Sequence, residues 1–316
     1  MSEIEIITDD PPIPRVPSGL YSFDRALGNP TRNEWGMPLR IIYTIYGKEH
    51  VGKSTLAYYL AGRVKQNGNI LLCDFEGVDP PYLATALQPS GFGGKLTVMP
   101  SADDKGPRFH SDMMGDTTKE LLEETVSSII LDSVSAIQSI AEQEGDVGES
   151  FMGRRAFIVS QFSRRLLSSL RAKEAHSAAF IINHSYVSLG RMQFESMAGG
   201  SVLRQQSAAI IKVKRIEQGF IDGRDDFLIE GEVKKLRYGG KGRKFLVFFL
   251  AGRGVHPGVT AVFDCIRSGL ADRPKGGYIK IDGKSHGRLK ALIGAADAGE
   301  DEKFQPFYEV LEAQNE

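Results

Sequence analysis

The chain has 316 residues, of which 41% are hydrophobic and 25% charged, a composition typical of a globular protein in water. No apolar run approaches the roughly 20 residues of a membrane-spanning helix, and the acidic N-terminus is unlike a signal peptide, so a membrane protein is excluded and a cytoplasmic one expected, in a bacterium or a phage-infected host. Cys73 and Cys265 are the only cysteines, and buried thiols in a reducing compartment are expected rather than a disulfide.

The net charge of −1 conceals an uneven distribution of charge along the chain. Residues 151–191 carry seven basic side chains against one acid, and residues 200–253 carry twelve against six. The segment from Glu300 to the end holds six acids and one lysine. This separation is typical of a surface that binds a polyanion, with an acidic terminus able to screen it. Solvated helix faces without any partner are the alternative.

Residues 1–15 are predicted to form an arm, in which Ile4, Ile6 and Ile7 favour a short strand for oligomerisation before prolines break regular structure. Helices are then expected over 18–27, 53–68, 118–126 and 152–175, and strands over 39–47, 69–77, 127–137, 177–186, 208–216, 226–239 and 243–252. Alternation of helices with continuous apolar strands predicts an α/β fold, with a mainly parallel sheet, flanking helices and late antiparallel strands. The core is expected over 16–270, followed by a small lobe with an acidic tail over 271–316.

Residues 46–60, YGKEHVGKSTLAYYL, place a glycine-rich loop between a predicted strand and a predicted helix. Gly47, Gly52, Lys53 and Ser54 match the spacing of a phosphate-binding loop. Glycines let backbone N–H groups surround phosphate oxygens, the lysine neutralises the terminal phosphates, and the hydroxyl ligates Mg²⁺. The predicted nucleotide-binding residues here are Gly47, Lys48, Glu49, His50, Val51, Gly52, Lys53, Ser54 and Thr55, with ATP and Mg²⁺ as the cofactors.

Two acids follow other buried strands. Asp132 comes after the run SSIIL, where an α/β sheet places ligand groups, and is predicted to hold the metal through water, with Ser54 as a ligand; a helix-capping aspartate is the alternative. Glu76 ends the strand ILLCDFE and is predicted to orient or deprotonate the attacking water. A surface acid without a role is the alternative for Glu76.

Several motifs occur in a fixed order along nearly the whole chain: PSGLYSFDRALG, GMPLRIIYTIYGKEHVGKSTL, DFEGVDPPYL, IILDSVSAI, EGDVGESFMGRRAFIVSQFSRRL, FIINHSYVSLG, ESMAGGSVLR and KGGYIKIDGKSHGR. In these motifs the chain resembles the RecA-type strand-exchange proteins, including the phage UvsX-like recombinases. The resemblance implies a RecA-like P-loop ATPase core. The tripeptide at 182–184, INH, is most similar to the phage members.

The resemblance implies roles around the nucleotide. Glu76 stands at the position of the catalytic glutamate, and Tyr82 at that of an aromatic residue that stacks on adenine, with a plain core tyrosine as the alternative. Asn183 and His184 stand where the family senses the γ-phosphate. Bacterial members have glutamine at the second position, so His184 adds a pH sensitivity that glutamine lacks; a structural histidine is the alternative.

The resemblance also implies contacts between copies of the chain, in a helical filament or a ring. Lys235 and Arg237 stand where the family sends two cations onto the ATP of a neighbouring subunit, which makes hydrolysis depend on assembly. An alignment shifted by one residue would select Lys234 instead.

DNA binding is implied for a first loop over 143–151 and a second loop over 185–200, both rich in small and polar residues. Arginines would bind phosphates without sequence preference, Met152 and Leu189 would wedge between bases with Phe194 assisting, and a glycine pair would turn the backbone. These residues are Met152, Arg154, Arg155, Arg164, Leu189, Arg191, Phe194, Gly199, Gly200 and Arg204. A loop with no such role is the alternative.

The resulting hypothesis is an ATP-dependent recombinase that polymerises on single-stranded DNA and pairs it with a homologous duplex. Its partners would be single-stranded DNA, double-stranded DNA, further copies of itself, and single-strand-binding and loader proteins. Two alternatives remain: a ring helicase, expected to carry a separate N-terminal assembly domain, and an ATP-gated scaffold or mediator that binds DNA without pairing it.

Overall fold

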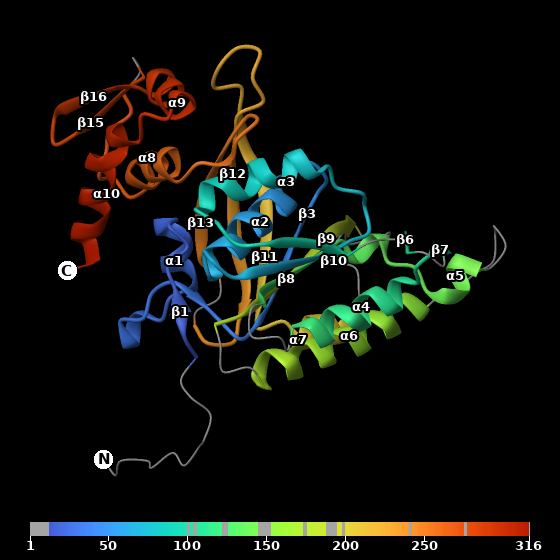
Figure 1. Ribbon diagram of the computed structural model, residues 1–316. Coiled ribbons are helices and arrows are strands. Elements are labelled where there is room, and N and C mark those ends of the chain that lie inside the picture. Colours follow the sequence, from blue (N-terminus) through green and yellow to red (C-terminus); the bar gives the residue numbers. More distant parts are fainter. Residues whose placement is uncertain are drawn as a thin grey trace, which may run out of the picture.

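A central sheet organises the molecule (Figure 1). The computed structural model describes residues 13–99, 102–103, 106–121, 126–144, 153–172, 176–187, 195–197, 200–239, 242–274 and 277–315. Within them, the strands of the sheet are β3 (Ile42–Gly47), β4 (Asn69–Asp74), β5 (Leu96–Met99), β8 (Val126–Asp132), β9 (Ala178–Val187), β10 (Glu195–Met197), β11 (Ala209–Gln218), β12 (Phe227–Leu236), β13 (Lys244–Leu250) and β14 (Gly254–Val255). Their order is β14-β13-β12-β11-β3-β9-β8-β4-β5, and β10 pairs with β9.

The run from β11 to β5 is parallel, while β12, β13 and β14 are antiparallel. This arrangement confirms the predicted α/β fold and the late position of the antiparallel strands. Strand β3 explains the continuous apolar sequence, because Tyr43 and Ile45 pack into a core on one face while Ile42 packs into a core on the other. Such two-sided burial is typical of parallel sheets covered by helices.

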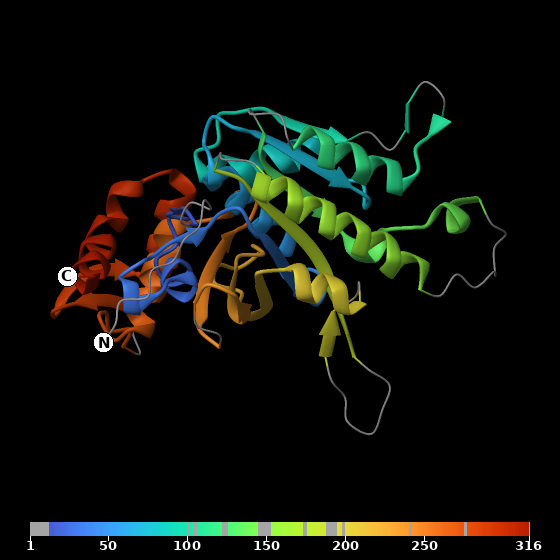
Figure 2. The ribbon, with the colours of Figure 1, turned by 90° about the horizontal axis from the view of Figure 1, so that it is seen from below.

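Helices cover both faces of the sheet. Helices α1 (Tyr21–Leu27), α2 (Lys53–Val64) and α3 (Pro80–Leu87) contribute to the core on one face. Helices α4 (His110–Glu120), α6 (Arg154–Ala172) and α7 (Gly200–Gln206) contribute to the core on the other face. Figures 1 and 2 show α4 and α6 side by side there. Within the described residues, no helix has both the length and the apolar character needed to cross a bilayer.

Shorter elements complete the described part of the chain. They are β1 (Arg15–Val16), β2 (Met37–Pro38), β6 (Ala102–Asp103), β7 (Gly106–Pro107), α5 (Ile140–Glu144) and the 3-10 turns η1 (Pro30–Arg32), η2 (Gln88–Ser90) and η3 (Val134–Ala136). The arm strand expected at Ile4–Ile7 lies outside the described residues.

The C-terminal segment packs into a core that it shares with β12 and β13. It contains α8 (Pro257–Arg267), the hairpin of β15 (Tyr278–Ile281) and β16 (Lys284–Arg288), α9 (Leu289–Ala298), η4 (Asp301–Phe304), α10 (Gln305–Glu312) and η5 (Ala313–Asn315). The acidic end is folded, because Phe304, Phe307 and Leu311 are buried in this core. Their spacing places apolar groups on one side of α10 and leaves the acids on the other. The division of the chain at residue 271 stays a prediction.

The helix expected over 118–126 was placed wrongly. Helix α4 begins at His110, and β8 already begins at Val126. The hydroxyls of Thr117 and Thr118 donate to the carbonyls of Met113 and Gly115 one turn earlier, 2.7 Å in each case, instead of capping a new helix.

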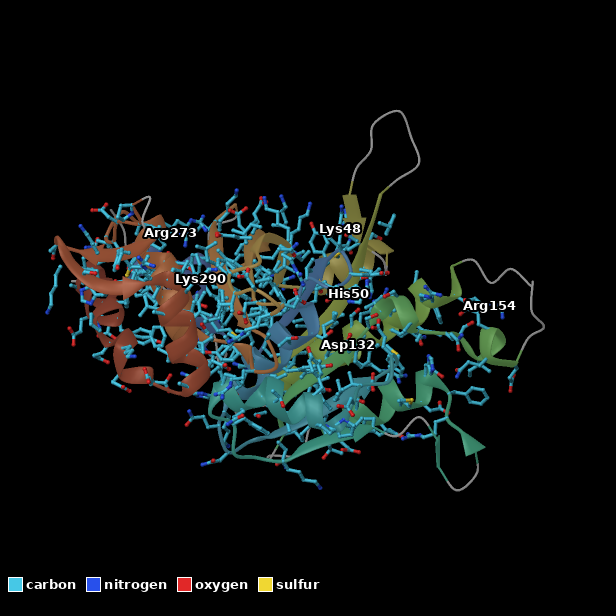
Figure 3. The ribbon with its side chains drawn as sticks, turned by 90° about the horizontal axis from the view of Figure 1, so that it is seen from above. Lys48, His50, Asp132, Arg154, Arg273 and Lys290 are labelled. Carbon is cyan, nitrogen blue, oxygen red and sulfur yellow. The ribbon has the colours of Figure 1, made fainter. Side chains whose placement is uncertain are left out.

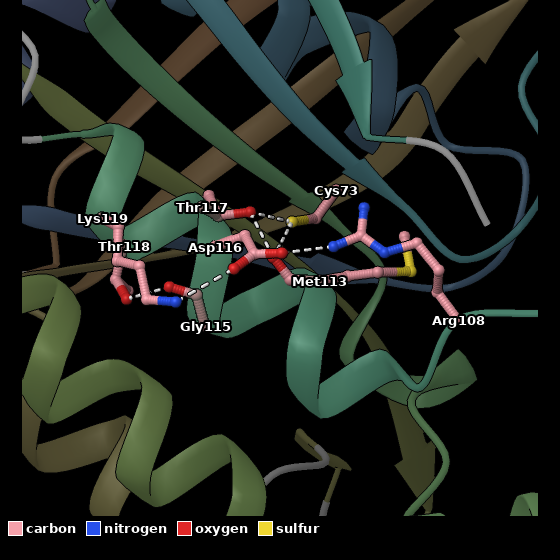
Figure 4. A network of polar contacts seen from close by, with 8 residues as sticks. All are labelled: Cys73, Arg108, Met113, Gly115, Asp116, Thr117, Thr118 and Lys119. Carbon is pink, nitrogen blue, oxygen red and sulfur yellow. Dashed lines mark hydrogen bonds and ion pairs between the residues drawn. The ribbon is translucent and has the colours of Figure 1, made fainter. Parts of the chain in front are cut away.

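Helix α4 is tied to β4 through a cysteine (Figure 4). The Sγ atom of Cys73 lies 2.7 Å from the hydroxyl of Thr117. Burial raises the pKa of Cys73 to about 12. Cys73 and Cys265 are both buried and unbridged, as predicted.

Candidate active site

The glycine-rich loop joins the end of β3 to the start of α2. A Cβ atom on Gly47 would lie 2.4 Å from the carbonyl oxygen of Val213, and one on Gly52 would lie 2.9 Å from the ring of Phe249. Gly52 and His50 also have left-handed backbone angles, with φ of 80° and 56°. The two glycines are therefore required by close packing, and at Gly52 also by backbone conformation.

The lysine of the loop points back into it. The Nζ atom of Lys53 donates a hydrogen bond of 2.7 Å to the carbonyl oxygen of Lys48. Burial lowers the pKa of Lys53, and the negative charges of Asp132, Glu76 and Glu49 oppose that shift. The ammonium group thus lies within reach of three carboxylates and inside the loop that would surround phosphates.

Asp132 ends β8 beneath this loop. Its Oδ2 atom accepts a hydrogen bond of 2.8 Å from the hydroxyl of Tyr58, while its buried Oδ1 atom has no hydrogen-bond partner among the described residues. Burial raises the pKa of Asp132 to about 6, and the hydroxyls of Ser54 and Tyr58 oppose the shift. An oxygen that is buried without a donor is a site where a cation or its water would be stabilised.

The oxygens of Ser54 and Asp132 fit the preference of Mg²⁺ for hard ligands. Within the described residues, no three His, Cys, Asp or Glu side chains lie together in a group that could hold a metal ion. This donor set fits Mg²⁺, which keeps several waters and is completed by substrate phosphates.

Glu76 lies beyond β4 and is fixed from several sides. The carboxylate of Asp74 accepts from the backbone N–H groups of Glu76 and Gly77, at 3.0 and 2.9 Å, which shapes the turn. The Oε1 atom of Glu76 accepts a hydrogen bond from the hydroxyl of Ser133 and lies 3.3 Å from Nε2 of His184. The sheet therefore brings His184, within β9, next to the segments that follow β4 and β8.

These side chains surround a cavity of about 460 Å³. It is lined by Glu49, His50, Gly52, Lys53, Ser54, Thr55, Glu76, Tyr82 and His184. Its lining is typical of a phosphate site, since the ammonium group of Lys53, the hydroxyl of Ser54 at a helix N-terminus and the carboxylate of Glu76 line the same cavity.

A second cavity, of about 480 Å³, adjoins the first. His50, Gly52, Thr55 and Tyr82 line both cavities, and Asp79, Phe227 and Phe249 are among the other residues of the second. Tyr82 is 45% exposed, and its hydroxyl is hydrogen-bonded to that of Thr55. A plain core tyrosine is therefore excluded, and the ring is available to a ligand.

The structure does not bring Lys235 and Arg237 to this site. Lys235 donates to the carbonyl oxygens of Arg204 and Gln205, at 2.8 and 3.0 Å, and Arg237 donates to that of Gln205 at 3.1 Å. Both cations thus hold the last turn of α7, whose carbonyls lack helical partners. Their strand is level with Tyr43 and Thr44 near the start of β3, whereas the phosphate loop leaves the end of β3.

The residues predicted to bind DNA are only partly described. Arg154 and Arg164 are exposed on α6, Arg155 forms an ion pair with Glu142 at 3.9 Å, and Arg204 is exposed in the last turn of α7. Arg154, labelled in Figure 3, is the first residue of α6. Gly200 begins α7. Outside the described residues lie Met152, Leu189, Arg191, Phe194 and Gly199.

The second loop segment includes regular structure that was not predicted. Strand β9 continues to Val187 and pairs with β10, so that Tyr186 faces Ser196 in an antiparallel register. The strand that carries His184 is thus continuous with one side of this hairpin.

Sequence patterns did not reveal Tyr58, Ser133 or Arg215. The hydroxyl of Tyr58 donates to Asp132, and that of Ser133 donates to Glu76. Arg215 donates to the carbonyl oxygen of His50 at 2.8 Å. Ser133 could have been found from the sequence, because it directly follows Asp132 and therefore lies at the same end of the sheet as the predicted carboxylates. Arg215 had none, because its role depends on the parallel pairing of β11 with β3.

Known proteins resemble this chain over about two thirds of its length. A family model described as the RecA N-terminal domain matches residues 7–236. Protein RecA of Frankia casuarinae is 31% identical over 216 residues, which are 66% of this chain and 56% of the relative. Protein RecA of Bacillus subtilis is 31% identical over 218 residues, 66% of this chain and 57% of the relative. The chain thus spans little more than half the length of these curated relatives.

A solved structure is similar in fold. The crystal structure of the RadB recombinase matches with a TM-score of 0.54 and 18% identity, covering 76% of this chain and 98% of that one. At this identity the similarity concerns the fold alone.

Proposed function

Because this chain belongs to the family defined by the RecA N-terminal domain, a family of ATPases, we propose that it is an ATP-dependent recombinase. It forms filaments on single-stranded DNA and catalyses homologous pairing and strand exchange in recombination and repair. Within the family we place it with the UvsX-like members of phages, on the basis of the INH tripeptide at 182–184.

The proposed reaction is hydrolysis of ATP at the cavity between β3, β4, β8 and β9. Lys53 and the backbone of the glycine-rich loop neutralise and orient the phosphates. Ser54 and Asp132 would hold Mg²⁺, which would stabilise negative charge on the phosphate oxygens. Glu76 accepts a proton from the attacking water, and the hydroxyl of Ser133 keeps that carboxylate in place. Tyr82 stacks on the adenine.

One contact carries the link from hydrolysis to DNA. Glu76 lies 3.3 Å from His184, and β9 runs from His184 into the hairpin with β10. A change at the terminal phosphate, sensed by Asn183 and His184, therefore reaches the second DNA-binding segment along a single strand. Lys235 and Arg237 complete the site of a neighbouring copy, which couples hydrolysis to assembly.

The test is a strand-pairing assay with labelled single-stranded DNA, a homologous supercoiled duplex and ATP. Joint molecules without directional unwinding support the recombinase. ATP hydrolysis stimulated by DNA but without joint molecules supports the scaffold, and directional unwinding supports the ring helicase. Electron micrographs with a non-hydrolysable ATP analogue distinguish a filament from a ring.

A further inference from the structure

Arg215 extends from β11 along the outside of the glycine-rich loop. Strand β11 is parallel to β3 and pairs Lys212 with Tyr46, so Arg215 lies three residues further on, beyond the end of β3. One of its terminal nitrogens donates to the carbonyl oxygen of His50 at 2.8 Å. The side chain lines the second cavity, the one that contains Tyr82.

The guanidinium group of Arg215 is held in a fixed plane. Its other terminal nitrogen donates to Gln218 at 2.9 Å and to Asp225 at 3.1 Å. Its central carbon lies 3.8 Å from the centre of the Phe227 ring, which is itself stacked on Phe249 with 4.7 Å between centroids and 12° between planes.

These contacts leave the second face of the Arg215 guanidinium group available to a ligand. Both terminal nitrogens have acceptors, and one face lies on Phe227, yet 24% of the side chain of Arg215 is exposed. A guanidinium with its edges bonded and one face covered can offer a ligand its second face, and aromatic rings are the partners that bind such a face.

We propose that Arg215 is a stacking surface for the base of the bound nucleotide, acting in the same cavity as the ring of Tyr82. This inference rests on the proposed function, since it assumes ATP as the ligand. A cavity of about 480 Å³ that adjoins the phosphate cavity has room for a purine and its ribose. Arg215 therefore contributes to the selection of a purine nucleotide over a bare polyphosphate.

A purely structural role makes a different prediction. Through His50, Arg215 also braces the phosphate loop. Loss of the brace would weaken every ligand that binds through its phosphates, whether or not it carries a base. Loss of the stacking surface would weaken only ligands with a base.

The experiment compares the affinities of MgATP and of magnesium tripolyphosphate, measured by calorimetry on the full chain. The Arg215→Lys variant keeps the charge and a donor for His50 but lacks the planar group. We expect its affinity for MgATP to fall about tenfold, and its affinity for tripolyphosphate to change less than about twofold. Arg215→Gln, which also keeps a donor, gives the same comparison if the lysine variant does not fold.

Lys214 provides the matched control. It precedes Arg215 on β11 and forms an ion pair with Glu230 at 3.1 Å, away from both cavities. Lys214→Ala should change neither affinity. Equal losses for both ligands in Arg215→Lys, or no loss at all, would overturn the inference while leaving the proposed function in place. A wild-type protein that binds neither ligand would overturn the proposed function, and the inference with it.

Discussion

The Nε2 atom of His184 lies 3.3 Å from the Oε1 atom of Glu76, although β8 separates β9, which carries His184, from β4, which Glu76 follows. Glu76→Gln keeps the shape and the bond to Ser133 but removes the base. We expect the rate of ATP hydrolysis to fall at least about 100-fold, with ATP affinity nearly unchanged. Phosphate release and equilibrium binding measure the two effects. Glu120→Gln, at an exposed acid of α4 that lines neither cavity, should hydrolyse ATP normally.

Replacement of Lys53 separates the phosphate contact from the loop itself. Lys53→Ala should abolish hydrolysis, because the ammonium group that faces the loop interior is lost. Lys48 contributes only its carbonyl oxygen to that contact, and its side chain is exposed. Lys48→Ala should therefore retain activity in the same phosphate-release assay. Ordinary turnover in Lys53→Ala would mean that the loop does not hold the triphosphate.

Adjacent lysines test the contact between copies. Lys235→Ala should still bind ATP but lose the stimulation of hydrolysis by single-stranded DNA. Loss of its bonds to α7 should lower the free energy of unfolding by no more than about 1 kcal/mol, so that folding is retained. Lys234, which pairs with Glu232 at 2.6 Å, is the control. Loss of stimulation in Lys234→Ala alone would instead support the alignment shifted by one residue.

The DNA contact proposed for Arg191 can be tested by its dependence on salt. Arg191→Ala should weaken binding to every sequence of single-stranded DNA alike, and should reduce the slope of log affinity against log salt by about one. Fluorescence anisotropy over a salt series measures both. Arg32→Ala, an exposed arginine of η1, should have no effect. A loss that differs between sequences would contradict a phosphate contact.

Asp264 predicts a dependence of stability on pH. Burial raises the pKa of Asp264 to about 7, above the roughly 3.9 of an unfolded aspartate. Between these two pKa values the folded state binds more protons than the unfolded state. The contribution of Asp264 to the free energy of unfolding is therefore complete below about pH 4 and is lost as the pH rises through about 7. Asp264→Asn should remove that part of the pH dependence and raise the melting temperature at neutral pH.

The control for Asp264 is an exposed aspartate in a turn, Asp282, where asparagine also tolerates the left-handed backbone. Asp282→Asn should leave the pH profile of the melting temperature unchanged. A profile for Asp264→Asn that parallels the wild type would show that the carboxyl does not titrate in this range.

Sequence patterns predicted the positions of those site residues that lie within one continuous segment of the chain. The loop at Gly47–Ser54 and the position of Asp132 depend on a strand, a tight turn and a helix that follow one another in sequence. The parallel sheet followed from the same alternation. The start of α4 was missed: the helix begins at His110, and the hydroxyls of Thr117 and Thr118 bond carbonyls of the preceding turn within it.

The contacts that the sequence did not predict depend on the order of the strands in the sheet. The contact of Glu76 with His184 and the position of Arg215 beside His50 depend on which strands are neighbours, and sequence spacing does not encode that order. The acidic residues after Glu300 obscured an apolar side formed by Phe304, Phe307 and Leu311. Charge alone therefore suggested a tail where the chain forms a packed helix.

The phosphate loop and the pair Lys235 and Arg237 lie at opposite ends of the strands. If each copy gives these cations to one neighbour and receives them from another, the contact is head-to-tail and the copies follow one another in a single direction. In an open row of this kind, the first copy keeps two unused cations and the last keeps an incomplete catalytic centre. The two ends are then chemically distinct, and addition and loss of subunits need not occur at equal rates at each of them.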